Sequence, residues 1–452
     1  MRLPEIAKIN WRSPIIQLIA FLFINQFLIG AIAFVSTPPG PNEAGWKYTY
    51  DLMQVKGGAD SWNAMTAAVN HLEEEPDKLL YSTLVFEEGT KFQYPPQSLP
   101  PYRVVSFGVH QVTDNTNRGF AAIGVACVLI IAGLTAIILA QSENRPVGPL
   151  YLLAGLFAAV TFYPLIRGVA LGQIQTWITL AFTAALLLGM NGRMRLSGVF
   201  IGFACLLKPH YGLFVLWGAL RKEWGFSVAI LAVCAIASVV SLILYGFAQH
   251  FDYLHFLSFL SRHGEPYFPN QSVNGILNRL YGLAEPDLYP NLTFLGHSFA
   301  PFNPVVYGGT MVFAVASLGT ALWASRRDLA LSFCIMMLSI TVSSPVAWEH
   351  HYGLALPIFA VAFGALRDRP SALAWLAVSY VLVSHVWLVT NLLANTPVNI
   401  VQSYLFFGAI ILLVLLHQAA IRKTVPGSDP FYDKGLWERF TRRARPGNSG
   451  TQ

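Results

Sequence analysis

An aspartate near the start of the chain has the setting of a catalytic base. Asp60 follows Gly57-Gly58-Ala59 and precedes Ser61-Trp62 in an amphipathic run. A carboxylate beside an apolar surface can take up the proton of an attacking hydroxyl group. Aspartate is also a favoured residue at the start of a helix, so a capping role stays open. Asp51 is the nearby carboxylate that competes for the role of base.

Lys208 and Arg279 are cations whose surroundings favour a phosphate group. Lys208 precedes Pro209 and His210 in the middle of the apolar segment 196–220, where a charge is costly. A helix that begins after Pro209 would add its N-terminal N–H groups to the charge of the lysine. A lysine that only anchors the turn by snorkelling is the alternative. Arg279 follows an amide-rich loop, and its planar guanidinium group suits a phosphate.

Amide side chains recur at two places and could bind the hydroxyl groups of a sugar. Gln173 and Gln175 belong to the run Gly-Gln-Ile-Gln, and Asn270 and Gln271 begin the run Asn-Gln-Ser-Val-Asn-Gly. Amides both donate and accept hydrogen bonds, which suits a polyhydroxyl ligand. For the first pair, capping of a nearby helix is the alternative.

The densest polar and aromatic cluster is Trp348-Glu-His-His-Tyr352. Its histidines, His350 and His351, could orient a phosphate or balance its charge, and Trp348 could offer a ring face to a sugar or an isoprenoid. Adjacent histidines lack the i, i+4 spacing of a helical zinc pair, so no metal site is predicted. An aromatic belt with a capping histidine is the alternative. Tyr94 is the comparable aromatic residue of an earlier loop.

The composition requires membrane helices to position these residues. Of 452 residues, 54% are hydrophobic and 12% are charged, which is about half of the usual charged share of about 25%. Apolar runs of about 20 residues, the length of a membrane-spanning helix, recur along the chain. Soluble enzymes, nucleic-acid binders and disordered scaffolds are thereby excluded. The four cysteines lie in apolar runs without metal-like spacing, so we predict neither a disulfide framework nor a cofactor.

The apolar runs predict an all-α polytopic membrane protein with ten full spans and one broken pair of helices. Segment 196–220 is the pair, because Lys208-Pro209 interrupts it and basic residues flank both of its ends. We expect the chain to enter and return there. The predicted spans are 14–35, 119–140, 148–167, 171–190, 226–247, 304–324, 329–345, 350–366, 371–391 and 399–421.

Loop charges orient these spans. The loops of one side, together with both termini, hold 19 of the 29 Lys and Arg residues but only 8 of the 23 Asp and Glu residues. Because basic residues favour the cytoplasmic side, both termini are predicted to be cytoplasmic. The N-terminus 1–13 and the basic tail 422–452 then flank one transmembrane domain, 14–421. Its external loops are predicted over 36–118, 248–303 and 343–352, and the large first loop should carry interfacial helices.

Taken in order, the candidate motifs resemble glycosyltransferase family 87 of the GT-C superfamily, the polyprenyl-phosphate-mannose-dependent α-mannosyltransferases. The shared order and the common external side extend over roughly residues 14–420. The second amide of the family's Gly-Gln-x-Asn pattern is Gln175 here, which is one methylene longer. The resemblance is carried by Asp60, Phe92-Gln-Tyr-Pro-Pro96, Gly172-Gln-Ile-Gln175, Lys208-Pro209, Asn270-Gln-Ser-Val-Asn-Gly275 with Arg279, Ser344-Pro345, Trp348 and His350-His351.

The resemblance implies an integral-membrane hexosyltransferase with the GT-C fold. It would move a hexose, expected to be mannose, from a polyprenyl-phosphate donor to a glycolipid or glycan acceptor at the external face of the cell membrane, with inversion at the anomeric carbon. Asp60 would be the base for the acceptor hydroxyl group. Tyr94 and Trp348 would serve the acceptor and its loop. The donor phosphate and sugar would be bound by Lys208, Arg279, His350, His351, Gln173, Gln175, Asn270 and Gln271.

A secondary transporter is the alternative from a different class, because transporters also use broken helices and intramembrane charges. Transporters place polar residues near the membrane centre and tend to have repeated halves. Here the polar motifs gather at one face, and the sequence shows no repeat. A flippase or ligase of envelope polysaccharide is the second alternative. Only a transferase would consume the donor and form a new glycosidic bond without moving a solute.

Overall fold

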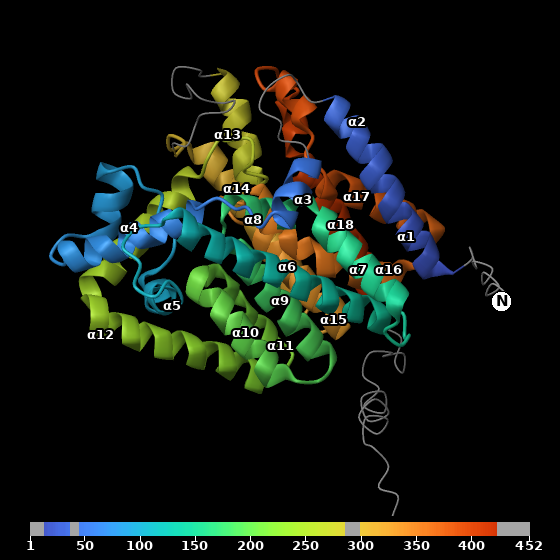
Figure 1. The fold of residues 1–452 in the computed structure, drawn as a ribbon, viewed down its shortest axis with the longest axis horizontal. Helices are drawn as coiled ribbons and strands as arrows, with labels where there is room; N and C mark the ends of the chain where they lie inside the picture. The colour runs from blue at the N-terminus through green and yellow to red at the C-terminus, as the bar shows by residue number, and fades with distance from the viewer. Residues whose placement is uncertain (1–12, 37–44, 285–298, 423–452) are drawn as a thin grey trace, which may run out of the picture.

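Helices form the regular structure of the computed structural model, which describes residues 13–36, 45–284 and 299–422 (Figure 1). No β-strand occurs in these three stretches. Together with the apolar composition, the helices make the chain a polytopic membrane protein. The predicted tail from residue 423 onward and the N-terminal residues 1–12 lie outside the described residues.

Five helical segments in the described part of the chain are long and apolar enough to cross a membrane. Each overlaps a predicted span, so these five apolar helices are confirmed. The helix Trp224–His263 is longer than its predicted span 226–247 and continues into the predicted loop 248–303. The ten-span topology stays a prediction. The five segments are Pro14–Val35, which comprises α1 (Pro14–Ile24), a π-helical turn (Asn25–Ile29) and α2 (Gly30–Val35), then α6 (Asp114–Ser142), α12 (Trp224–His263), α14 (Pro304–Ala324) and Asn399–Arg422, which ends in α18 (Tyr404–Arg422).

The span predicted over 148–167 is not the single straight helix that we expected. Two helices form there, α7 (Pro149–Thr161) and α8 (Tyr163–Leu171), and the pair is bent by 53°. Phe162 between them is extended, and Pro164 stands in the first turn of α8. Proline starts a helix well but cannot continue one, because it lacks the N–H group and clashes with the preceding turn.

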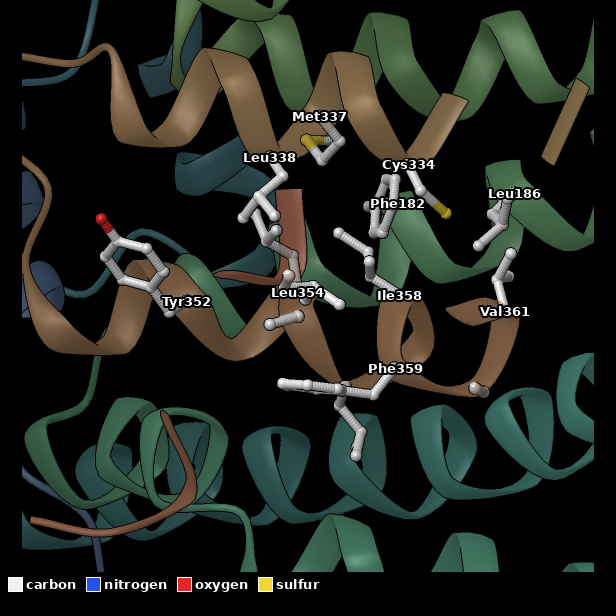
Figure 2. Packing of buried hydrophobic residues seen from close by; sticks show 14 of the residues in the cluster. Phe182, Leu186, Cys334, Met337, Leu338, Tyr352, Leu354, Ile358, Phe359 and Val361 are labelled. Atoms are coloured by element: carbon white, nitrogen blue, oxygen red, sulfur yellow. The ribbon is translucent and has the colours of Figure 1, made fainter. Parts of the chain in front are cut away.

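The centre of the helix bundle is an apolar contact among three shorter helices. Every residue of α15 is buried, and Figure 2 shows Phe182, Cys334 and Ile358 packed close to one another. In lipid such contacts stabilise helix association by van der Waals packing. The three helices are α9 (Gln175–Met190), α15 (Leu329–Val342) and α16 (Ala355–Leu366), which lie within the predicted spans 171–190, 329–345 and 350–366.

A broken pair of helices occupies the predicted place. α10 (Met194–Leu207) ends at Lys208, whose backbone is extended with ψ 96°. The chain continues through the 3₁₀ segment η4 (Pro209–Leu213) into α11 (Phe214–Leu220). The residues that break the helix are therefore the ones that the sequence indicated.

Both ends of this pair meet the same point of α12. A Cβ atom added to Gly198 in α10 would lie 2.4 Å from the carbonyl oxygen of Phe226, and one added to Gly218 in α11 would lie 2.7 Å from the Phe226 ring. Glycine at these two positions permits the close approach. The chain therefore turns back at Lys208 and returns to the level at which the pair began.

Residues 45–113, part of the predicted first external loop, pack against the second half of α12, and this half follows a break in the helix at Gly246 with φ 76°. Asp252 in that half accepts hydrogen bonds from the backbone N–H groups of Tyr81 at 2.6 Å and Ser82 at 3.1 Å. This contact fixes the loop, whose helices are α3 (Gly45–Met53), α4 (Asp60–Glu74) and α5 (Leu99–Val105). The remaining helices used below are α13 (Val273–Ala284), α17 (Pro370–Ser384) and the 3₁₀ segment η5 (Glu349–Leu354).

Candidate active site

The segment that precedes Asp60 lies directly against the end of α8. The N–H group of Gly58 donates to the carbonyl oxygen of Ala170 at 2.8 Å, and that of Ser61 donates to Gly172 at 3.2 Å. Gly172 has φ 71°, and a Cβ atom there would lie only 1.9 Å from the carbonyl oxygen of Gly58. Only glycine fits this position, because the approach is too close for any side chain.

This contact places the carboxylate of Asp60 beside an amide that the sequence also indicated. Gln173 Nε2 donates to Asp60 Oδ2 at 3.4 Å, while Ser61 Oγ donates to Gln173 Oε1 at 3.0 Å. Asp60 is the first residue of α4 and its side chain is exposed. Both Asp60 and Gln173 therefore belong to one hydrogen-bonded group, and the carboxylate stays accessible to a ligand. Asp51 lies in α3 and makes no side-chain hydrogen bond within the described stretches.

Tyr94 joins the same group from the segment between α4 and α5. Its hydroxyl group lies 2.7 Å from Ser61 Oγ. Burial raises the pKa of Tyr94 to about 12, the hydrogen bond with Ser61 lowers it, and the charge of Asp60 raises it further. The hydroxyl group therefore stays protonated at neutral pH and stands close to the Asp60 carboxylate.

A second group forms where Lys208 contacts residues 348–352, here called the histidine turn because they contain His350 and His351. Lys208 Nζ lies 2.7 Å from His351 Nε2. An ammonium group can only donate, so Nε2 of a neutral His351 accepts this hydrogen bond from Lys208. The lysine charge has no carboxylate partner in the described structure, which leaves it available to an anion.

Arg167 and His210 also belong to this second group, although neither was predicted to be a site residue. Arg167 in α8 donates to the hydroxyl group of Tyr48, and its guanidinium carbon lies 4.9 Å from the centre of that ring. His350 lies close to both cations. A Cβ atom on Gly168, the residue after Arg167, would lie 3.8 Å from Cβ of His350, and the His350 ring centre lies 4.7 Å from that of His351, the partner of Lys208. In the sequence, Arg167 was recognisable only as a single charge at the end of an apolar run.

His210 is the other unassigned residue. It is exposed, and its ring centre lies 4.6 Å from that of Tyr211. It also lies near His351. The turn of the broken pair thus brings together Lys208, His210 and His351, of which Lys208 and His351 are half-buried.

One short segment holds the two groups together. This segment, residues 167–173 and here called the α8 turn, begins with Arg167 and ends with Gln173. A Cβ atom at Gly168 within it would lie 3.8 Å from Cβ of His350. The α8 turn therefore touches the histidine turn with one end and Asp60 with the other. A carboxylate and a set of cations are therefore linked through one short segment, and an acid–base step with an anionic leaving group requires both kinds of group near the reactants.

Asn270 and Gln271 are buried away from solvent, and their amides are engaged by the protein. Asn270 Nδ2 donates to the carbonyl oxygens of Glu265 at 2.9 Å and Pro345 at 3.0 Å. Gln271 Nε2 donates to the carbonyl oxygen of Gln402 at 2.8 Å. These bonds hold the 265–272 loop against the segment before the histidine turn, so the geometry gives both amides a structural role.

Arg279 is also buried, with 1% of its surface exposed. Its guanidinium group donates to the hydroxyl group of Ser403 and, at 3.4 Å, to the carbonyl oxygen of Asn270. Arg279 therefore contacts neither the group around Asp60 nor the group around Lys208. It lies in α13 between the apolar residues Leu277 and Leu280, and its burial results from the packing of this helix against residues 399–403.

Trp348 and Gln175 lie at the edges of the site. Trp348 Nε1 donates to Glu265 Oε2 at 2.8 Å, and Lys91 bonds the other oxygen of Glu265 at 2.9 Å. The Trp348 ring lies 6.1 Å from that of His351. Gln175 is almost fully buried beside Tyr211, and neither of its amide atoms has hydrogen-bond geometry to a partner.

No group of three or more His, Cys, Asp or Glu side chains suited to a metal ion occurs in the described part of the chain. Among known families, the one described as Glycosyltransferase family 87 matches residues 92–348. That stretch contains Tyr94, Gln173, Lys208 and Trp348, whereas Asp60 precedes it and His350 follows it. No curated protein matches the chain.

Proposed function

Since the chain belongs to glycosyltransferase family 87 and is therefore a membrane glycosyltransferase, we propose the identity of its substrates and the roles of its residues. The donor is a polyprenyl-phosphate hexose, with mannose as the sugar. The acceptor is a hydroxyl group of a glycolipid or glycan. Transfer takes place at the external face of the cell membrane and inverts the anomeric carbon.

The observation that supports this proposal is the pair of groups held by the α8 turn. Asp60 takes the proton of the acceptor hydroxyl group, whose oxygen forms the new bond to the anomeric carbon. The bond from that carbon to the phosphate oxygen breaks, and the phosphate leaves with the electron pair. Lys208 and Arg167 stabilise the charge that develops on the phosphate. Because a phosphate is already a fair leaving group, no acid is needed to protonate it.

The other site residues position these reactants. Gln173 orients Asp60, while His351 and His350 orient Lys208 and the phosphate. Tyr94 and Trp348 border the space for the acceptor and the sugar, and Gln175 supports the turn beside Tyr211. Asn270, Gln271 and Arg279 act indirectly by holding the loop that carries Trp348.

We extend the proposal to the topology. Ten spans and the broken pair cross or enter the membrane within residues 14–421, and both termini are cytoplasmic. The excess of Lys and Arg in one set of loops supports this orientation. Arg195→Cys and Lys222→Cys flank the broken pair and should both react with a membrane-impermeant thiol reagent from the cytoplasmic side only. Reaction from opposite sides would contradict the orientation.

The function is tested by reconstituting the full-length protein in liposomes with polyprenyl-phosphate [³H]mannose and an extract of envelope glycolipids. We expect a new radiolabelled glycolipid and free polyprenyl phosphate. Asp60→Asn should lower the rate by at least ~10²-fold, the low end for a general base, and Asp51→Asn is the matched control that should stay near wild type. If Asp60→Asn consumed the donor and Asp51→Asn did not, Asp60 would not be the base. Movement of label across the membrane without a new linkage would indicate a flippase.

A further inference from the structure

An apolar cavity of about 400 Å³ lies between α1, α6, α7, α16 and α17. None of the site residues described above lines it. The cavity is half-open, and small residues make room for it, among them Gly155 and Ala158 of α7 and Ala374 and Ala377 of α17. It is therefore a second concave feature, separate from the region around Asp60 and Lys208.

The cavity is long, and one end of it is polar. Its lining begins at Pro14 and Pro370, the first residues of α1 and α17, and reaches Tyr380 in α17. At 1.5 Å per residue, the stretch from Pro370 to Tyr380 is about 15 Å long. That is half of the ~30 Å hydrocarbon core of a bilayer. The cavity thus extends over the depth of one leaflet, and Gln17 and Arg367 stand at its polar end.

The polar end has a small excess of positive charge, because three arginines (Arg145, Arg367 and Arg369) lie there with two carboxylates (Glu143 and Asp368). Arg367 lines the cavity and donates to the carbonyl oxygen of Glu143 at 3.1 Å, and Arg145 and Arg367 both lie near Tyr151. The carboxylate of Glu143 accepts a hydrogen bond from the hydroxyl group of Tyr151 at 2.6 Å. Asp368 lies 3.7 Å from Arg367 but is almost fully exposed to solvent, which weakens the pair. This end also carries the loops that the charge distribution assigns to the cytoplasm.

We propose that this cavity binds one acyl chain of an anionic diacyl phospholipid of the cytoplasmic leaflet, with the headgroup phosphate beside Arg367. The apolar walls and the depth of one leaflet match the chain, and the arginines match the charge of the headgroup. A soluble metabolite would gain little from walls that consist mostly of apolar side chains. The lipid acts on the fold and not on the transferred sugar, so this inference does not depend on the proposed reaction.

The test is native mass spectrometry of the full-length protein in detergent, titrated with phosphatidylglycerol and, in parallel, with phosphatidylcholine. Ala374→Phe fills the cavity from α17. The matched control is Val378→Phe, which adds a larger ring to the same helix at a position that is exposed and does not line the cavity. We expect wild type and Val378→Phe to retain one phosphatidylglycerol in preference to phosphatidylcholine, and Ala374→Phe to lose it.

The headgroup is tested separately with Arg367→Gln and Arg367→Lys. Loss of one basic residue near an anionic lipid costs about 1 kcal/mol, so Arg367→Gln should weaken phosphatidylglycerol binding about fivefold, while the lysine variant should keep most of it. Equal binding by Ala374→Phe and wild type would overturn the proposal. So would equal retention of both lipids by wild type, or a dimer that Ala374→Phe dissociates, because the cavity would then be an interface between two copies.

Discussion

Amide and charged side chains are used in opposite ways in two parts of this molecule. Around Asp60, Gln173 makes only two hydrogen bonds to side chains, and the carboxylate remains exposed. Around Arg279, Asn270 and Gln271 are completely buried and bond backbone groups on several sides. The same residue types thus leave hydrogen-bonding capacity open in one region and use it for the fold in the other.

The difference shows which contacts separate a binding site from a structural clamp. A buried amide that is fully bonded has no donor to offer a ligand, and removing it leaves backbone groups unpaired. An accessible carboxylate, or an ammonium group that is not paired with a carboxylate, can still bind a substrate. Substitutions in the first region should therefore change catalysis, and substitutions in the second should change stability.

Lys208→Gln should have the largest effect on catalysis among these tests. It removes the charge that faces the donor phosphate, and we expect transfer to fall by about 10²-fold, the loss typical when one group that stabilises transition-state charge is removed. Lys208→Arg keeps the charge but changes its geometry, so it should recover only part of the rate. Single-turnover transfer by protein of verified fold is the measurement. A glutamine variant with the wild-type rate would leave Lys208 only the role of an anchor.

Gln173→Leu should have an intermediate effect. The leucine keeps the size of the side chain but cannot donate to Asp60 or accept from Ser61, so the carboxylate loses its orientation. We expect turnover to fall about tenfold, less than for the loss of the base itself. Because Gln173 acts through Asp60, the pH at which activity rises should also shift, and steady-state rates measured across pH would reveal it. An unchanged pH profile with a lower melting temperature would mean that Gln173 only supports the fold.

Gln271→Ala should affect turnover least. It leaves the carbonyl oxygens of Phe268 and Gln402 without their buried donor, and each unpaired group costs about 1–3 kcal/mol. The expected result is a lower melting temperature in detergent with nearly normal turnover per folded molecule. The measurement pairs thermal unfolding with active-site-normalised kinetics. A large loss of donor affinity in stably folded protein would instead place Gln271 in the donor site.

The sequence predicted those features that depend on local chemistry. Lys208-Pro209 marked the break of a helix because both residues are costly inside an apolar helix. The need for glycine at position 172 was not predicted, because it arises from the close approach of the distant Gly58. The sequence also could not predict that Arg279 would be buried or that Arg167 would lie near Lys208, since both depend on how distant helices pack. The bend at Phe162 was missed because hydropathy shows that a segment is apolar but not in which direction its helix axis runs.

The central claim is that Asp60 acts on the acceptor while Lys208 holds the donor phosphate. The most direct test is donor binding and single-turnover transfer by Asp60→Asn and Lys208→Gln, measured over a range of polyprenyl-phosphate mannose concentrations. We predict that Asp60→Asn binds the donor as tightly as wild type but transfers the sugar at least ~10²-fold more slowly. Lys208→Gln should lose both donor affinity and rate. Normal donor binding by Lys208→Gln together with weakened binding by Asp60→Asn would contradict the account.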